Sequence, residues 1–202
     1  MIKNIIFDFG GVLMDWDPRY FYKNYFQNDE KMEYFLQNIA TSQWNEEQDA
    51  GRTLEDGTQI LIDQFPDWEK QIRAFYDNWS VMLKGEIEEN VEILRKLSTT
   101  QYELFGLTNW SSETFPYALE HYSFFEIFNN KIVVSGIEKI KKPDPKIWHI
   151  LLQRYNLVAK ESVFIDDNPK NIEVAGQLGF KTIKINPDSD LKAELSTFGI
   201  NI

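Results

Sequence analysis

The sequence predicts an α/β fold, with a Rossmann-like parallel sheet core, helices on both faces and an inserted all-α helical segment. Short apolar runs alternate with amphipathic stretches over residues 85–202, which is typical of right-handed βαβ units. A similar apolar run begins the chain at residues 5–7. Between them, residues 18–84 are rich in aromatic side chains at helical spacing. We therefore expect a core formed by residues 1–17 and 85–202, with residues 18–84 as a helical insert.

The expected strands are short apolar runs, as in sheets buried on both faces. The first is Ile5–Phe7, which ends in an acid and two glycines. The same pattern recurs later in the chain, at Tyr102–Leu107, Ile132–Val134, Ser162–Ile165 and Phe180–Ile185.

Helices are expected between these strands. Ile87, Val91, Leu94 and Leu97 fall on one helical face, and a further helix is expected over 111–121. Two more helices carry a polar cap followed by proline, a common start signal, at Asp144-Pro145 and Asn168-Pro169, and Gly179 closes the second. The insert is expected to hold about four helices, broken at Gly51 and Pro66.

Composition excludes several classes of function. Asp and Glu number 32 against 21 Lys and Arg, a net charge of −11, which disfavours nucleic-acid and membrane-surface partners. There is no cysteine, so thiol catalysis, disulfides and Cys-zinc sites are excluded. Only 2 histidines are present, which makes a His-based catalytic triad hard to build. No apolar run is long enough to span a bilayer and no signal peptide is evident. We expect a cytoplasmic monomer or weak homodimer.

Polar groups follow three of the expected strands. They are Asp8, Thr108-Asn109 and Asp166-Asp167, and Lys142 precedes a helix that can bring it to the same place. Ligands of open α/β sheets bind beyond the carboxyl ends of the strands, so these groups should converge. Clustered carboxylates need a counter-ion, and oxygen-only ligands suit Mg²⁺.

This set of residues suits phosphoryl transfer. The Thr108 hydroxyl, the Asn109 amide and the Lys142 ammonium are donors for phosphoryl oxygens. A carboxylate such as Asp8 can act as nucleophile and form an aspartyl-phosphate, which water then hydrolyses.

Four motifs, in chain order, carry a resemblance to a known family. They are Ile5–Leu13, Leu107–Asn109, Lys142–Pro145 and Phe164–Asn168. Together with an insert between the first and second motifs, they resemble the haloacid dehalogenase-like hydrolases.

The resemblance implies a role for each motif. Asp8 would be the nucleophile, Thr108 would bind phosphate and Lys142 would be the motif cation. Asp166 and Asp167 would hold Mg²⁺, with Asp167 favoured as the direct ligand. The insert would be the cap that covers the site and selects the substrate.

Two positions depart from the family pattern, Lys139, where relatives often have Gly, and the position two residues after the nucleophile. Phosphatases of the family usually carry a second Asp two residues after the nucleophile, as general acid, but this chain has Gly10. Only the Gly10 backbone carbonyl remains, as a metal ligand. A subgroup with Gly here resembles sugar-1-phosphate phosphatases, notably those for α-glucose-1-phosphate, whose anomeric leaving group needs an external proton less. Asp15 or Asp17 could supply a carboxyl instead, although a hinge role is favoured for both.

Three further residues complete the candidate set. Gly11 allows the backbone to approach phosphate. Arg52, beside Gly51, is a substrate-binding candidate, although a surface salt bridge is the favoured interpretation. Asn171 is expected on a helix surface rather than at the site.

The favoured function is a Mg²⁺-dependent phosphatase for a small phosphorylated metabolite, a sugar phosphate in particular. The first alternative is a 2-haloacid dehalogenase-type hydrolase, which needs no Mg²⁺. The paired acids Asp166-Asp167 favour the phosphatase, because dehalogenases of the family lack them. The second alternative, motivated by Gly10, is a catalytically weak domain that binds metal or phosphate.

Overall fold

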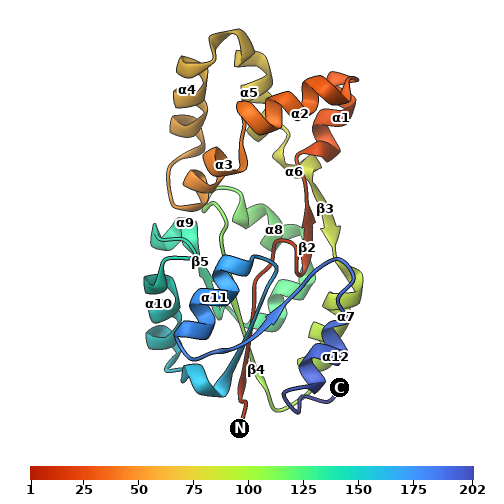
Figure 1. Cartoon of the computed structure of the whole chain (residues 1–202), viewed down its shortest axis with the longest axis vertical. Helices are drawn as coiled ribbons and strands as arrows, with labels where there is room; N and C mark the ends of the chain where they lie inside the picture. The colour runs from red at the N-terminus through yellow and green to blue at the C-terminus, as the bar shows by residue number, and fades with distance from the viewer.

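The computed structural model describes residues 1–202 and is built around one parallel sheet. Its five strands run in the order β5-β4-β1-β6-β7, and all neighbours pair in parallel. The expected parallel α/β core is therefore confirmed, with β1 at its centre (Figure 1). The strands are β1 (Asn4–Phe7), β4 (Glu103–Thr108), β5 (Ile132–Val134), β6 (Ser162–Asp166) and β7 (Lys181–Lys184).

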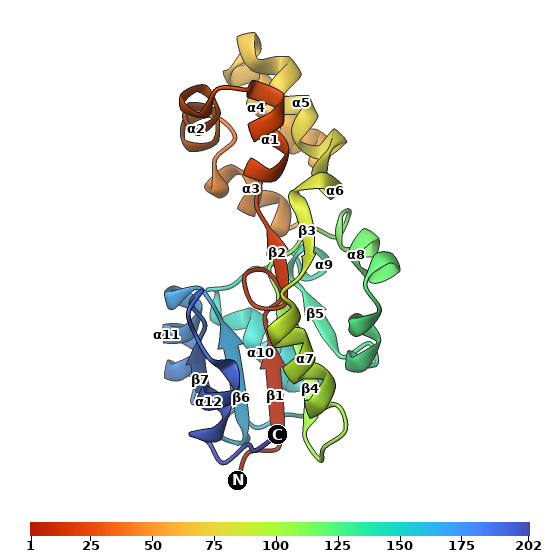
Figure 2. The same cartoon turned by 90° about the vertical axis from the view of Figure 1, so that its right-hand side faces the viewer.

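Both faces of the sheet are covered, which explains why its strands are continuously apolar. In β1, Ile5 and Phe7 point to one face and Ile6 to the other, and all three are fully buried. Each such side chain contributes about 1.5–3 kcal/mol of hydrophobic stabilisation. Figure 2 shows helices on both sides of the sheet. The first face packs on α7 (Glu88–Leu97), α8 (Phe115–His121) and α12 (Leu191–Ser196), and the second on α10 (Pro145–Tyr155) and α11 (Pro169–Gln177).

The capping signals in the sequence act as expected. The Asp144 carboxylate accepts a hydrogen bond from the Lys146 backbone N–H at 2.9 Å, and α10 begins at Pro145. The Asn168 side chain accepts from the Lys170 N–H at 3.0 Å at the start of α11. These caps fix where each helix leaves the loops at the carboxyl edge of the sheet.

The insert folds as a helical module with its own core. Tyr22, Phe35 and Phe75 are buried there in a cluster separate from those of the sheet. More helices form than the roughly four that spacing predicts, namely five helices of 8–11 residues and two single turns, η1 and α6. The helices are α1 (Arg19–Phe26), α2 (Asp29–Asn38), α3 (Ser42–Asp49), α4 (Leu54–Gln64), η1 (Pro66–Trp68), α5 (Glu69–Asp77) and α6 (Trp79–Met82).

A two-stranded antiparallel ribbon joins the module to the core (Figure 2). It consists of β2 (Met14–Trp16) and β3 (Leu83–Glu86), with Asp15 opposite Gly85. The sequence predicts no strand here, because such short strands show no alternation and their partners are far apart in the chain.

One helix begins later than expected. The helix predicted from Ser111 starts at Phe115, because the Ser111 hydroxyl accepts a hydrogen bond from the Glu113 N–H and forms a turn. Short helical turns complete the chain at η2 (Ser123–Phe128), α9 (Ser135–Glu138) and η3 (Ala159–Glu161). None of the helices is both long and apolar enough to cross a membrane.

Candidate active site

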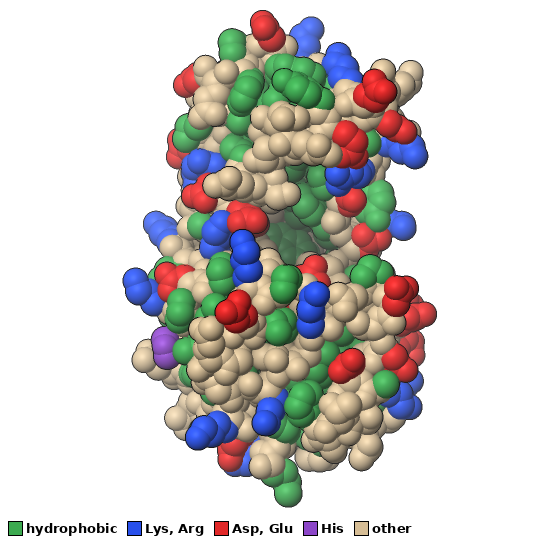
Figure 3. Space-filling model, viewed as in Figure 1, with side chains coloured by type: hydrophobic (Ala, Val, Ile, Leu, Met, Phe, Trp, Pro, Cys, Tyr) green, Lys and Arg blue, Asp and Glu red, His purple; other side chains and the backbone are tan.

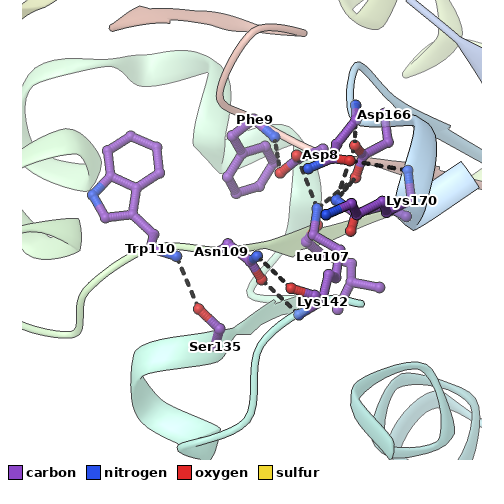
Figure 4. A network of polar contacts seen from close by, with 11 residues as sticks. Asp8, Phe9, Leu107, Asn109, Trp110, Ser135, Lys142, Asp166 and Lys170 are labelled. Carbon is purple, nitrogen blue, oxygen red and sulfur yellow. Dashed lines mark hydrogen bonds and ion pairs between the residues drawn. The ribbon is translucent and has the colours of Figure 1, made fainter. Parts of the chain in front are cut away.

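The polar residues predicted from the strand ends meet at one edge of the sheet. Asp8 follows β1, while Thr108 and Asp166 are the last residues of β4 and β6, the two neighbours of β1. Parallel neighbours end at the same edge, so their side chains converge there, as Figure 4 shows for Asp8 and Asp166. Asp8, Thr108 and Asp166 are all buried.

Lys142 lies at the centre of this cluster and is 1% exposed. Its Nζ is 2.8 Å from Asp8 Oδ2 and 2.7 Å from Asp166 Oδ2. It also donates a hydrogen bond to the Leu107 carbonyl at 2.9 Å. Burial acts to lower the pKa of Lys142, but the Asp166 and Asp8 carboxylates outweigh it, so the pKa is raised and the amine stays protonated.

Asp166 is held by donors on every side. Besides Lys142, the Asn168 backbone N–H donates to Oδ1 at 2.8 Å, and Asn171 Nδ2 lies 3.1 Å and 3.0 Å from the two oxygens. The expectation that Asn171 lies on a helix surface was wrong: its side chain is 3% exposed and points back to the strand end. The signal that would have found it is its place in the first turn of a helix that starts directly after the acid pair.

Three carboxylates face one another in this site. Oxygen atoms of Asp8, Asp166 and Asp167 all lie within 4.8 Å of one another. Burial raises the pKa of Asp8 to about 8, with the Asp166 and Asp167 carboxylates adding to the effect and Lys142 opposing it. The pKa of Asp167 is also raised, by burial and by Asp166. One ammonium does not balance three carboxylates, and this oxygen-only set fits a divalent cation such as Mg²⁺.

Asp166 and Asp167 differ in what surrounds them. The oxygens of Asp166 accept hydrogen bonds from protein groups, whereas the Asp167 carboxylate is exposed and touches no cation of the chain. It lies against Gly11, whose φ is +69°, and a Cβ at Gly11 would collide with the Asp167 carboxylate. The loop after β1 therefore has room for the Asp167 side chain only because residue 11 is glycine.

Two donor groups, one backbone N–H and one side-chain hydroxyl, flank the nucleophile candidate. The Phe9 N–H donates to Asp8 Oδ1 at 2.7 Å and fixes the orientation of the carboxylate. Thr108 Oγ1 is buried without any hydrogen-bond partner. A buried hydroxyl without a partner is costly, so Thr108 is suited to donate to a ligand oxygen such as that of a phosphoryl group.

A cavity of about 110 Å³ opens beside the cluster, between the helical module and the core. A Cβ added to Gly10 would meet nothing within 4 Å, so the backbone that follows the nucleophile candidate leaves open space there. Figure 3 shows the hollow between the two parts, with hydrophobic side chains deep inside it. The cavity is lined by Gly10, Met14, Trp16, Asn45, Asp49, Tyr76, Trp79, Asn109, Trp110, Ser111 and Thr114.

Two of the predicted binding residues are engaged by other protein groups. The Asn109 amide donates to the Lys142 carbonyl at 2.9 Å and accepts from the Lys142 N–H at 2.8 Å (Figure 4), so it fixes the Lys142 loop. The Arg52 guanidinium donates to Gln48 Oε1 at 2.6 Å and to the Trp44 carbonyl at 3.0 Å, and it forms no salt bridge. Their roles toward a substrate stay predictions.

Asp15 and Asp17 lie at the joint between the two parts. Asp15 accepts a hydrogen bond from the Tyr20 hydroxyl at 2.8 Å and is 3.5 Å from the Lys84 amine on the opposite strand. Asp17 accepts from the Arg19 backbone N–H at 2.8 Å. Neither carboxylate lines the cavity.

The module contacts the core directly above the site. The Ser135 hydroxyl donates to the Asp49 carbonyl at 2.5 Å and accepts from the Trp110 N–H at 2.9 Å. The Leu54 N–H donates to Glu113 Oε1 at 2.8 Å. These bonds place the end of α3 over the carboxyl edge of the sheet, as Figure 1 shows.

Known proteins share this architecture. D-Ribitol-5-phosphate phosphatase from Bacteroides thetaiotaomicron is 26% identical over 97% of this chain and 98% of its own length. A HAD family enzyme from the same organism, solved in complex with magnesium and inorganic phosphate, has a TM-score of 0.71 at 25% identity, covering 96% of this chain and 99% of its own.

Partial matches include other activities. (S)-2-Haloacid dehalogenase 4A from Burkholderia cepacia is 30% identical over 47% of this chain and 41% of its own length. The chain spans only 6% of acyl-CoA dehydrogenase family member 10 from Mus musculus and 36% of drimenol cyclase drtB from Aspergillus calidoustus, two further relatives that it matches.

A single family model covers the sheet, the helical module and all four motifs. It describes the haloacid dehalogenase-like hydrolases and matches residues 5–185. With the strand-end carboxylates, the buried lysine and the cavity already in place, the chain belongs to the haloacid dehalogenase-like hydrolases.

Proposed function

We propose that this protein is a Mg²⁺-dependent phosphatase that hydrolyses a small phosphorylated metabolite through an aspartyl-phosphate on Asp8. The single observation that carries the proposal is the cluster at the sheet edge: three carboxylates within 4.8 Å of one another, beside one fully buried lysine. Such a set repels anions until a cation joins it, and it then suits a phosphoryl group.

Each side chain has a part in the proposed reaction. Asp8, oriented by the Phe9 N–H, attacks phosphorus, and water later cleaves the acyl phosphate. Lys142 and the Thr108 hydroxyl stabilise the charge on the phosphoryl oxygens. Asp8, Asp167 and the Gly10 carbonyl would hold Mg²⁺, with Asp166 beside it. The ion would neutralise charge on the carboxylates and on the phosphoryl oxygens.

Asp167 is the favoured direct ligand of the acid pair. Asp166 is saturated with donors from Lys142, Asn168 and Asn171, whereas the Asp167 carboxylate is more exposed and forms no ion pair within the chain. The proposed role of Asp166 is therefore to hold Lys142 against Asp8 in a fixed position.

We further propose that residues 18–84 act as the cap and that a sugar or polyol phosphate is the substrate. The cavity is walled by Trp79 and Trp110 and carries the polar side chains of Asn45 and Asp49, a mixture that suits a hydroxylated leaving group. The similarity to a ribitol-phosphate phosphatase supports the same class. Gly11, Asn109 and Arg52 remain the candidate substrate contacts.

Hydrolysis of p-nitrophenyl phosphate with and without Mg²⁺ tests the proposal. We expect turnover that depends on the metal and is lost in Asp8→Asn, which keeps the shape of the side chain but is no nucleophile. Turnover that survives in Asp8→Asn, or that EDTA leaves unchanged, would contradict the proposal.

Dehalogenation is the second candidate, favoured by the partial match to a haloacid dehalogenase. In that reaction Asp8 attacks carbon rather than phosphorus. Chloride release from a 2-haloacid in the presence of EDTA would support it over the phosphatase. A wild-type protein inactive in both assays, yet able to bind Mg²⁺ or phosphate, would support a binding domain.

A further inference from the structure

When an alkyl phosphate is hydrolysed, the oxygen of the departing alcohol must gain a proton. When Asp8 attacks phosphorus, the bond from phosphorus to the leaving oxygen breaks and its electron pair stays on that oxygen. An alkoxide is a poor leaving group in water, so a positioned acid contributes about 10²–10⁴-fold to the rate. Gly10 has no side chain with which to supply this proton.

The groups of the carboxylate cluster are committed to other partners. Lys142 is bonded to Asp8, Asp166 and the Leu107 carbonyl. The carboxylates of Asp15 and Asp17 lie at the joint and outside the cavity wall. A proton donor for the leaving oxygen must therefore come from another residue of the cavity.

Asp49 is the acidic residue in that wall. It is the last residue of α3, and the hydrogen bond from Ser135 to its carbonyl fixes it against the core. It shares the cavity with Gly10 and Asn109, which belong to the loops that carry Asp8 and Thr108. Figures 1 and 2 both show α3 as the part of the module next to the core.

We infer that Asp49, from the helical module, is the general acid and base of the reaction, in place of the side chain that Gly10 lacks. This inference rests on the proposed phosphatase function. The Asp49 carboxyl gives its proton to the leaving oxygen as the phosphoryl group moves to Asp8, which releases the alcohol. The resulting carboxylate takes a proton from the water that attacks the aspartyl-phosphate, and this step releases phosphate, regenerates the Asp8 carboxylate and returns Asp49 to its protonated form.

The surroundings of Asp49 suit this role. Burial raises its pKa to about 7, Glu46 on the same helix adds to the effect, and Lys141 from the loop after α9 opposes it together with a backbone hydrogen bond from Ser111. Tyr76 on α5 also faces the group, and burial raises the pKa of this hydroxyl, so it stays neutral. Asp49 is thus partly protonated near neutral pH, where an acid that later acts as a base is most effective.

Replacing Asp49 by Asn tests the inference through its dependence on the leaving group. The amide keeps the size of the side chain and an acceptor for the Ser111 N–H, but it cannot give a proton. Wild type and variant, both with Mg²⁺, are compared by kcat/KM on p-nitrophenyl phosphate and on either ribitol 5-phosphate or glucose 6-phosphate, whichever the wild type hydrolyses faster.

We expect kcat/KM for the alkyl phosphate to fall about 10²–10⁴-fold in Asp49→Asn, and kcat/KM for the aryl phosphate to fall no more than about threefold, because nitrophenolate leaves without a proton. Glu47→Gln is the matched control, since it removes an exposed carboxylate from the same helix outside the cavity; it should change both values equally and little. A purely structural role of Asp49 predicts equal losses on both esters, and that result overturns the inference alone. No turnover of either ester by the wild type overturns the proposed function and the inference with it.

A second variant tests whether a carboxyl at residue 10 can take over the role of Asp49. A side chain at residue 10 meets open space, so Gly10→Asp can be added to Asp49→Asn. We expect the added carboxyl to restore at least about tenfold of the lost alkyl-phosphate activity. A folded double variant without any recovery would show that carboxyls at residues 10 and 49 do not protonate the same leaving oxygen, and it would overturn the inference.

Discussion

Replacing Lys142 by Met should destabilise the protein strongly in the absence of Mg²⁺. The fully buried ammonium lies 2.8 Å from Asp8 and 2.7 Å from Asp166, and methionine keeps most of the chain length but no charge. Removing one partner of a buried ion pair costs about 3–5 kcal/mol, because the other charge stays buried and uncompensated. For a chain of this size that corresponds to a fall in Tm of about 6–20 °C.

Thermal unfolding of wild type, Lys142→Met and Lys141→Met measures this effect. Lys141 is the matched control: it is the next residue, and it pairs with Glu46 at 2.7 Å near the surface. A surface pair is worth about 0–1 kcal/mol, so Lys141→Met should change Tm by only a few degrees. Equal shifts in the two variants would refute the view that Lys142 balances the carboxylates.

Magnesium separates charge from packing in the same experiment. A divalent cation is drawn to a more negative site, so Mg²⁺ should raise the Tm of Lys142→Met more than that of wild type. If the variant were destabilised by a packing defect alone, Mg²⁺ would stabilise both proteins to the same extent.

Three further changes are expected to act on the same cluster. The pKa of Asp8, raised to about 8 in the folded protein, lies above its unfolded value. The contribution of Asp8 to stability is therefore complete in acid and is lost as the pH rises toward 8. The Tm of the metal-free protein should fall over that range, and a Tm that rises would contradict the shift. Gly11→Ala should weaken Mg²⁺ binding in calorimetry, because the new Cβ displaces Asp167, whereas Gly10→Ala should leave it unchanged; equal affinities in both would argue against Asp167 as a ligand. Asn171→Ala should lower the free energy of unfolding in urea by about 1–3 kcal/mol, since Asp166 loses a buried donor, and a change below about 0.5 kcal/mol would place Asn171 outside the network.

Local patterns were enough to predict the sheet and its polar edge. The strand ending at Asp8 and the strand ending at Asp166 are apolar throughout because both sheet faces are buried, and this signal lies within each run of residues. The topology of parallel sheets then brings strand ends to one edge, so the meeting of Asp8, Thr108 and Asp166 follows without knowledge of the strand order. The helix caps at Asp144 and Asn168 are equally local.

Other parts depend on contacts between distant segments. The β2–β3 ribbon pairs Asp15 with Gly85, and strands this short leave no pattern of their own. The contact of Asn171 with Asp166 is local by comparison, because the two residues are close in the chain and Asn171 lies in the first turn of α11.

Residues 1–17 and 85–202, taken as sequence, therefore determined the sheet and the acids at its edge, because hydrophobic periodicity and strand polarity are properties of short segments. The tertiary structure alone decided which residues of the helical module line the cavity beside those acids. Asp49 stands there because α3 docks on Ser135 and the Trp110 loop, through hydrogen bonds between residues far apart in the chain. Residue spacing in the sequence does not predict such a contact, because the contact depends on how the helical module packs on the core.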